Sequence, residues 1–357
     1  MDKWMDLFSP EAIALLWTEA EKTQVPYLGT GLFPARKQAG LDLSWLKGAS
    51  GLPISLMPST FDAQATYRDR IGVEKLGTEM PFFREGYKIK EKDRQELLRV
   101  LSSNDPYVQA VISHIYQDIQ DLIKGANVVP ERMRMQLLFA ANGNLAIQIK
   151  ANGVDYTYNY DPNGTWKAKN YYALSGNNTW DNASTADPFE DVRKARDKIR
   201  DDGGEVPQYA IMNSVTFRLL RKSDAIKNRF LTTNGRSVAY LKDSDVKSVF
   251  LDTTELSGIM LYDNKYRDEN KVVKKFVPDG YVALVPGGAI GSTVYGTTPE
   301  EADLMGSGEA KVSIVNTGVA ITQTVDPHPV NLNIYASEIV LPSYEGVDNV
   351  ALLKVTA

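Results

Sequence analysis

One long irregular segment restricts the folds open to this chain more than any other feature. From Thr23 to Pro58, glycines and prolines recur every few residues and interrupt each helical or strand pattern. The segment nevertheless carries large apolar side chains, among them Tyr27, Phe33 and Trp45, which disordered linkers lack. A compact domain rarely contains such a long stretch without regular structure. We therefore expect an extended arm that buries its apolar side chains on its own domain or on neighbouring subunits.

Residues 59–89 form a second extended element, in which apolar and polar residues alternate as they do in β-strands. Gly72 and Gly77 bracket a turn predicted at Val73–Leu76. The pattern predicts a long hairpin with apolar strands and a charged tip. Its predicted contact residues are Arg68, Asp69, Arg70, Glu74, Lys75, Phe82 and Phe83. An isolated two-stranded ribbon is only marginally stable in water, so this hairpin also needs a surface to lie on.

The strongest helical pattern runs from Pro106 to Lys124, with a capping residue before it and Gly125 after it. Apolar residues recur there every three or four positions, which predicts one buried face. A second helix is expected at Pro130–Ala141. Shorter helices are predicted from Pro10, between Asp187 and Gly203, and near Ser214–Arg221 and Asp224–Leu231.

Strand patterns dominate the rest of the chain. Asn152-Gly153 between two alternating segments predicts a hairpin, since this dipeptide suits a two-residue turn. Further strands are expected at Tyr209–Met212, Ser248–Leu251, Gly258–Tyr262, Val272–Val277, Tyr281–Val285, Ala310–Thr324, Asn331–Leu341 and Val350–Val355. Helices and strands do not alternate regularly, so the pattern indicates an α+β fold with mixed sheets.

Composition excludes several classes of function. The 357 residues contain 40 Lys and Arg against 45 Asp and Glu, a net charge of −5, which argues against a surface built to wrap nucleic acid. The absence of Cys excludes disulfide scaffolds, thiolate metal sites and a Cys nucleophile. The sequence has no secretion signal and no apolar run of membrane-spanning length, so we expect no membrane segment.

The motifs that could carry chemistry are weak. Gly287–Ser292 is rich in glycine but has no following Lys, so a turn is expected rather than a nucleotide site. Residues 159–164 resemble the start of a calcium loop, but position twelve is Asn170 instead of an acid. His114 and His328 are isolated, and a structural role is expected for both. We therefore predict no catalytic residue, no cofactor and no metal.

Two further surface features have competing interpretations. The aromatic residues between Tyr156 and Tyr172 could stack on sugars, but cross-strand pairing explains them equally well. Asp197, Asp201, Asp202 and Glu205 form an acidic group, interpreted as a solvated helix end.

The order of elements resembles a known family. Lys274-Lys275-Phe276-Val277-Pro278-Asp279-Gly280 and Val282-Ala283-Leu284-Val285-Pro286, with Tyr262–Tyr266 before them, are similar to the inner domain of tailed-bacteriophage major capsid proteins of the lambda-type head protein (E protein) family. Tyr295-Gly296, Asp326-Pro327 and Leu341-Pro342 also fit. The resemblance extends over nearly the whole chain and implies the Hong Kong 97-like fold.

The resemblance implies a domain layout. Residues 1–52 would be the N-terminal arm and 53–90 the extended β-hairpin loop. Residues 91–205 with 325–357 would form the peripheral domain, with its spine helix, and 206–324 the axial domain.

The resemblance also implies a function and partners. The chain would assemble with itself, as pentamers and hexamers, into an icosahedral shell around double-stranded DNA, without sequence-specific DNA binding. A scaffolding protein and a portal would take part, and a decoration protein is possible. The shell would be assembled in the host bacterial cytoplasm and become part of the virion. The arm's tryptophans Trp4, Trp17 and Trp45 are expected to contact neighbouring subunits.

Two alternatives stay open at this point. A cargo-storing nanocompartment uses a shell subunit of the same fold, but without DNA, portal or scaffold. A carbohydrate-binding or glycan-acting protein rests only on the aromatic segment.

Overall fold

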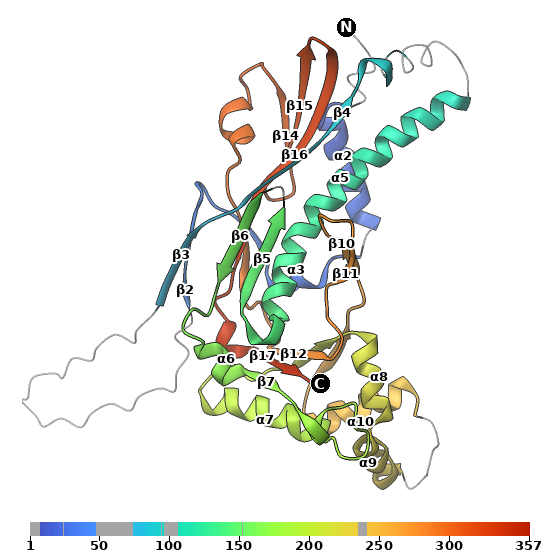
Figure 1. The fold of residues 1–357 in the computed structure, drawn as a ribbon, viewed down its shortest axis with the longest axis vertical. Helices are drawn as coiled ribbons and strands as arrows, with labels where there is room; N and C mark the ends of the chain where they lie inside the picture. Colours follow the sequence, from blue (N-terminus) through green and yellow to red (C-terminus); the bar gives the residue numbers. More distant parts are fainter. Residues whose placement is uncertain are drawn as a thin grey trace, which may run out of the picture. The chain divides into compact units, whose positions relative to one another are not determined.

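The computed structural model describes residues 8–23, 25–47, 74–93, 95, 106–151, 153–234 and 241–357 (Figure 1). These residues form two compact units. Unit 1 is drawn from Met1–Ser44, Gly77–Met133 and Ser292–Ser343, and unit 2 from Trp45–Leu76, Arg134–Gly291 and Tyr344–Ala357. Each unit has its own sheet, which is described separately below.

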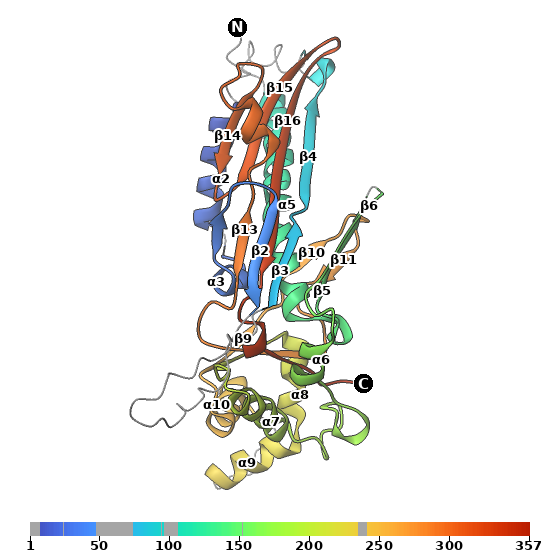
Figure 2. The ribbon, with the colours of Figure 1, turned by 90° about the vertical axis from the view of Figure 1, so that its left-hand side faces the viewer.

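Unit 1 is built on a six-stranded sheet whose central strand is β16 (Val330–Ser343) (Figure 2). The main path of this sheet is β1-β13-β16-β15-β14, and β4 also pairs with β16. These strands span Ala35–Lys37 (β1), Ser292–Tyr295 (β13), Val319–Pro327 (β15), Lys311–Val315 (β14) and Phe82–Ile89 (β4). At 14 residues, β16 is long enough to pair with β15, β4 and β13 along its length.

Two helices supply the rest of the unit 1 core. Helix α2 (Pro10–Thr23) packs against β14 and β15, and α5 (Pro106–Leu138) contributes Ile119, Leu122 and Ile123. These side chains share a buried cluster with alternate residues of β16, such as Leu332 and Ile334. The alternation follows from the two-residue period of a strand, which turns one face of the sheet towards the helices.

Unit 2 is built on a five-stranded sheet in the order β7-β17-β12-β8-β9. The strands span Tyr171–Ala173 (β7), Ala351–Lys354 (β17), Tyr281–Val285 (β12), Tyr209–Met212 (β8) and Gly258–Leu261 (β9). The three inner strands pair antiparallel, whereas β7 and β9 add to the two edges in parallel.

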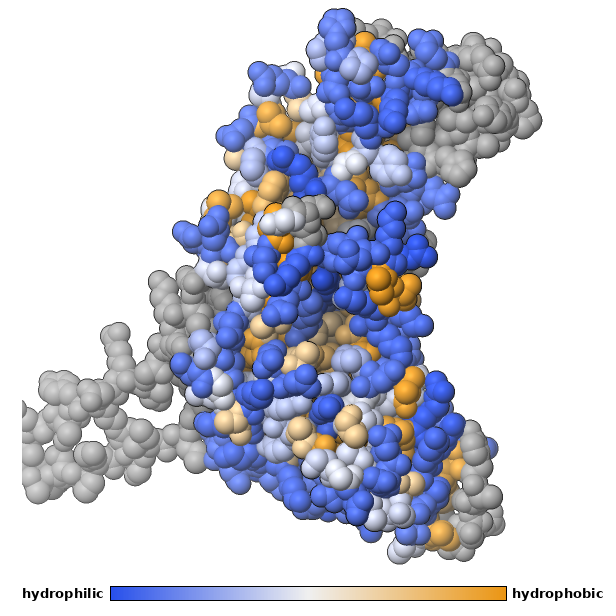
Figure 3. Space-filling model, in the orientation of Figure 1, coloured by the Kyte–Doolittle hydropathy of each residue, from blue (hydrophilic) through white to orange (hydrophobic). Residues whose placement is uncertain are grey.

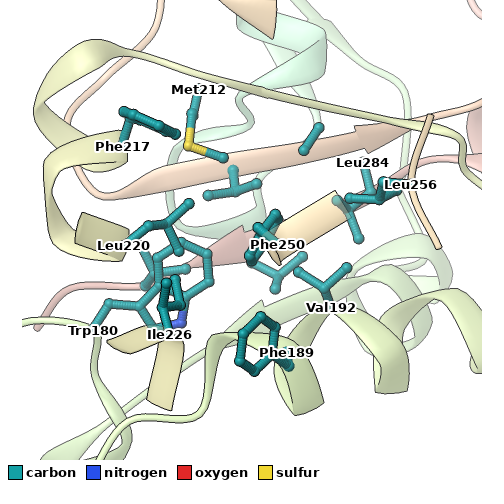
Figure 4. Packing of buried hydrophobic residues seen from close by; sticks show 14 of the residues in the cluster. Trp180, Phe189, Val192, Met212, Phe217, Leu220, Ile226, Phe250, Leu256 and Leu284 are labelled. Atoms are coloured by element: carbon teal, nitrogen blue, oxygen red, sulfur yellow. The ribbon is translucent and has the colours of Figure 1, made fainter. Parts of the chain in front are cut away.

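Four helices contribute to the main core of unit 2 together with this sheet. They are α7 (Pro188–Asp201), α8 (Ser214–Lys222), α9 (Asp224–Asn234) and α10 (Asp243–Thr254). Figure 4 shows Phe250 of α10 among side chains from several elements, including Phe189, whose ring centroid lies 6.0 Å away. These closely packed apolar side chains form one hydrophobic core of unit 2.

Shorter elements complete the described chain. The helical ones are α3 (Leu28–Leu32), α6 (Thr165–Asn170), η1 (Ala141–Gly143), η2 (Gly176–Asn178), η3 (Glu300–Leu304) and η4 (Val347–Asn349). Three two-stranded ribbons are β2 (Asp42–Lys47) with β3 (Glu74–Glu79), β5 (Ala146–Ala151) with β6 (Val154–Asn159), and β10 (Lys265–Arg267) with β11 (Val273–Lys275). The latter two ribbons project to the same side of unit 2 (Figure 2).

Two local predictions are confirmed by hydrogen bonds or strand pairing. Asp187 caps α7, because its carboxylate accepts hydrogen bonds from the backbone N–H groups of Phe189 and Glu190, both at 3.1 Å. The hairpin predicted around Gly153 is present, because β5 and β6 pair antiparallel up to Ala151 opposite Val154, and Gly153 has a φ of +80° that favours glycine.

Two predictions about helices are wrong. Residues 106–138 form one continuous helix, although Pro130 was expected to begin a second one. Buried Met133, Leu137 and Leu138 extend the apolar face of α5 beyond the proline, so packing offsets the lost backbone hydrogen bond. Ser248–Leu251 is part of α10 rather than a strand. Val246, Val249 and Phe250 follow the helical spacing and all point into the core.

The predicted hairpin at 59–89 differs in its described part. Glu74, Lys75 and Leu76 belong to strand β3, which pairs with β2, and so they are not turn residues. Strand β4 pairs with β16 over eight residues, from Ile89 opposite Leu332 to Phe82 opposite Ile339. The second half of the expected hairpin therefore pairs with the long central strand β16. Residues 59–73, which include the first half, lie outside the described residues.

Candidate functional site

The predicted contact residues fall into three groups in the structure. Trp4, Arg68, Asp69 and Arg70 lie outside the described residues. For Trp45, Glu74 and Lys75 the backbone is described, in β2 and β3, but the side chains are not. Trp17, Phe82 and Phe83 are described in full, and all three belong to unit 1.

Trp17 is an anchor within its own chain. Its side chain is 1% exposed and lies in the unit 1 core with Ile13 and Phe8. This buried cluster holds α2 on the sheet, and the amide of Gln323 donates a further hydrogen bond to the carbonyl of Phe8 at 3.0 Å. The burial of Trp17 thus needs no neighbouring subunit, and an intersubunit role for it stays a prediction.

Phe82 and Phe83 mark the start of β4, where the chain enters the central sheet. Phe83 packs at the margin of the unit 1 core. The guanidinium of Arg84 lies 4.7 Å from the ring centroid of Phe82, which is cation–π distance. The ring of Tyr335 packs directly against Gly86. A Cβ atom at this position would lie 2.4 Å from Cδ1 of the ring, which is too close, so the strand needs glycine here.

A pair of glutamates on η3 joins two of the strands in unit 1. Glu300 is buried and forms an ion pair with Arg84 of β4. Its neighbour Glu301 forms an ion pair with Lys37 of β1, with an N–O distance of 2.5 Å. One short helix therefore holds both β1, in the segment predicted as the arm, and β4, in the segment predicted as the second half of the loop hairpin. We call Glu300, Glu301, Arg84 and Lys37 the η3 clamp.

The far end of β4 is held by a second set of polar contacts. The Lys88 ammonium lies 3.1 Å from the Asp326 carboxylate at the end of the β15–β16 hairpin. This hydrogen bond holds the pKa of Asp326 below its ordinary value, and a further bond from Asn333 has the same effect. A hydrogen bond with the Asp118 carboxylate of α5 raises the pKa of the Tyr87 hydroxyl. Charged and polar groups thus fix β4 at both ends.

The described residues offer little for catalysis or metal binding. Within them, no three His, Cys, Asp or Glu side chains gather closely enough to hold a metal ion. The Asp161 carboxylate, which was weighed as a calcium ligand, instead accepts bonds from Thr165 Oγ1 and from the N–H groups of Trp166 and Lys167. The segment at Gly287 joins two strands, as expected of a turn. No helix in the described part of the chain has both the length and the apolar character needed to cross a bilayer.

The η3 clamp is the element that sequence reasoning missed. Arg84 and Glu300 are far apart in the sequence, and an isolated Arg or Glu in a charged chain carries no distinguishing pattern. The acidic run Glu300-Glu301 after Pro299 was the available signal, but its partners become visible only when β4 and β1 lie in one sheet.

A comparison with known protein families identifies the family of this chain. Residues 18–348 match the model of the family described as phage major capsid protein E. The chain belongs to this family. It is therefore a major capsid protein, a structural subunit of the icosahedral shell of a bacteriophage virion. The resemblance noted from the sequence is confirmed.

Solved structures agree on the fold. A protein described as the capsid protein of a prophage in E. coli CFT073 is 14% identical, with a TM-score of 0.59, over 98% of this chain and 99% of that one. A phage-related protein from Bordetella bronchiseptica RB50 is also 14% identical, with a TM-score of 0.55, over 95% of each chain. The α+β architecture is thus the Hong Kong 97-like fold. A comparison with curated proteins finds no match.

Proposed function

We propose that this capsid protein assembles as hexamers and pentamers into a closed icosahedral shell around double-stranded DNA, in the cytoplasm of a host bacterium. A scaffolding protein and a portal would direct assembly, and a decoration protein could bind the finished shell. Membership of the capsid family over residues 18–348 is the observation that carries this proposal. The nanocompartment alternative is not better supported.

We also propose a purely structural role, without catalysis or a cofactor. The best-defined polar arrangement of unit 1, the η3 clamp, joins strands to one another, and its charged groups are engaged in ion pairs. Polar groups used in this way stabilise a fold and leave no free acid, base or nucleophile at the clamp.

Electron microscopy of the purified protein, with and without co-expressed scaffolding protein, tests the assembly proposal. Closed shells of uniform size are expected, and persistent monomers under both conditions would contradict it. The ratio of absorbance at 260 and 280 nm of shells isolated from infected cells separates a DNA container from a nanocompartment, because only the former holds a genome.

We propose further that Trp4 and Trp45 of the arm and the charged loop residues contact neighbouring subunits. Reversing Arg68 and Arg70 to Glu should leave the circular dichroism of the subunit unchanged but reduce shell yield, because complementary charges select the correct neighbour. The control reverses Lys90 and Lys92, two exposed residues after β4. Equal shell yields for both variants and wild type would contradict the proposed role of the loop.

A further inference from the structure

Exposed apolar residues gather on one side of unit 2. Among the described residues of unit 2, five large apolar side chains are substantially exposed, and four of them lie at or near one sheet edge: Val215 (39%), Leu261 (37%), Val272 (52%) and Val273 (56%). Leu261 ends the edge strand β9, Val215 begins α8, and the other two lie on the β10–β11 ribbon. Figure 3 shows a small orange patch among blue residues in the region where Figure 1 draws β10 and β11.

Hydrogen bonds hold these residues together as one surface. The Asp263 carboxylate, just after β9, accepts bonds from the N–H of Ser214, at 2.9 Å, and from its hydroxyl. On the return side of the ribbon, the Asn213 amide donates to the Val277 carbonyl at 3.1 Å. Both ends of the β10–β11 ribbon are thus tied to the start of α8.

The ribbon itself is rigid. The ring of Tyr266 stacks on that of Phe276, with centroids 4.8 Å apart. At the tip, the Asp268 carboxylate accepts bonds from the N–H groups of Asn270 and Val272, at 3.0 and 2.9 Å, and pairs with Lys274 at 2.8 Å. The ribbon projects in a fixed shape, yet residues 264–275 contribute nothing to the main core of unit 2. Such a preorganised apolar surface is typical of a contact site.

The same surface is cationic. Five exposed basic side chains lie on it, none of them within ion-pair distance of an acid among the described residues: Arg218, Lys222, Lys265, Arg267 and Lys271. Exposed acids lie on the same surface: Glu269 at the ribbon tip, and Asp263 and Asp279 at the two ends of the ribbon. We call this surface, with its four apolar side chains, the β9 flank. Its charge contrasts with the net charge of −5 of the whole chain.

The opposite edge of the same sheet carries a group of acids, one of which is already paired: Asp202 lies 2.8 Å from the Lys198 ammonium and 4.0 Å from that of Lys169. Strand β7 forms that edge, and Asp202 lies near enough to Tyr172 of β7 to raise the pKa of its hydroxyl, in addition to the effect of burial. Asp201 and Glu205, beside Asp202, are exposed, and the described residues place no basic side chain within ion-pair distance of them. We call Asp201 and Glu205 the β7 flank, and together with the paired Asp202 they make up most of the acidic group noted in the sequence.

We infer that the β9 flank of one subunit binds the β7 flank of a second copy of this chain. A contact between two different flanks of identical subunits is head-to-tail, and such contacts close into a ring when the rotation between neighbours is a whole fraction of a turn. Opposite charges on opposite edges supply the complementarity, and the exposed valines supply apolar area at the contact. This inference rests on the proposed assembly into hexamers and pentamers and names the residues that would join neighbours in each ring.

Charge reversal with rescue tests the pairing. In the full-length chain, Arg218→Glu with Lys222→Glu should lower the assembled fraction about tenfold or more, and so should Asp201→Lys with Glu205→Lys, because like charges would then face each other. Combining all four substitutions in one chain should restore assembly, since each subunit supplies both flanks. Lys90→Glu with Lys92→Glu is the matched control, and circular dichroism checks that each subunit folds.

A second variant tests the apolar part. Val272→Ser with Val273→Ser should reduce assembly without lowering the melting temperature of the subunit, because these side chains are exposed in the isolated chain. The assembled fraction is measured by analytical ultracentrifugation over a range of concentrations.

The outcomes separate this inference from the proposed function. Normal assembly of either charge-reversed variant would overturn the pairing of the two flanks. So would a combined variant that assembles no more than the single reversals do. Neither result would contradict the proposed assembly into shells. A wild-type chain that stays monomeric at every concentration, even with scaffolding protein, would overturn both.

Discussion

The two units reach a stable core by different routes. In unit 2, most of the core comes from one stretch, from Trp180 to Leu284, completed by three residues of the C-terminal strand region. The core of unit 1 combines three distant stretches, Phe8–Trp17, Ile89–Ile123 and Tyr295–Val340. Distant pairings carry a larger loop-closure cost. Unit 1 is thus the unit whose folding depends on α2 and β4 reaching their places on the sheet.

Their polar interactions differ in the same way. In unit 2, two arginines of α7 bond to backbone carbonyls up to 60 residues away: Arg193 donates to the carbonyl of Thr253, and buried Arg196 to those of Pro207 and Thr254. In unit 1, the η3 clamp and the Lys88–Asp326 pair join segments that are remote in sequence. The polar contacts of unit 2 therefore join elements of one continuous stretch, whereas those of unit 1 join segments from opposite ends of the chain.

The largest expected effect is on the core of unit 2. Phe250→Ala should lower the free energy of unfolding by about 3–5 kcal/mol, because the fully buried ring leaves a cavity. Chemical denaturation followed by circular dichroism measures the change, and Ser248→Ala, an exposed position on the same helix, is the control. A decrease in the free energy of unfolding below about 1 kcal/mol would mean that this cluster contributes little to the stability of unit 2.

A somewhat smaller effect is expected at the anchor of the arm. Trp17→Ala should cost about 3 kcal/mol and release α2 from β14 and β15. Faster proteolysis within residues 8–23 is the measurement, and Leu15→Ala, at a side chain that is 70% exposed, should change nothing. Unchanged proteolysis of the Trp17 variant would show that α2 does not need this ring.

The η3 clamp should contribute less. Glu300→Gln should lower the free energy of unfolding by about 1–2 kcal/mol, since the carboxylate is buried but Arg84 is 46% exposed and can regain water. Hydrogen exchange at β4 amides should speed up, while the exposed Glu309→Gln should have no effect. If β4 keeps wild-type exchange, the backbone pairing with β16 is sufficient to hold it.

The smallest effect concerns pH. Because the Lys88 bond lowers the pKa of Asp326 in the folded chain, the pair stabilises the fold at pH values above the pKa of unfolded Asp, about 3.9. That contribution disappears as the pH falls through the lower folded value. An NMR titration of the subunit should show the Asp326 pKa rising in Lys88→Gln but not in Lys90→Gln. Equal Asp326 pKa values in wild type and Lys88→Gln would show that the Lys88–Asp326 pair does not contribute to the stability of unit 1.

The sequence by itself determined the local elements whose signals act over a few residues. Asp187 satisfies the N–H groups at the start of α7, Asn152-Gly153 matches the turn between β5 and β6, and apolar spacing predicts the buried face of α5. The family could also be identified from the sequence, because its motifs follow one another in a recognisable order along nearly the whole chain.

Only the tertiary structure decided which strands pair and which charges meet. The alternation of apolar and polar residues in Phe82–Ile89 is compatible with several partner strands. In the structure this segment pairs with the long strand β16 instead of the first half of the expected hairpin. Ser248–Leu251 has strand-forming residues, but packing on the unit 2 sheet stabilises the helix. The η3 clamp and the two charged flanks arise in the same way. Side-chain period and capping act between near neighbours, whereas pairing between distant segments depends on which surfaces the folded chain brings together.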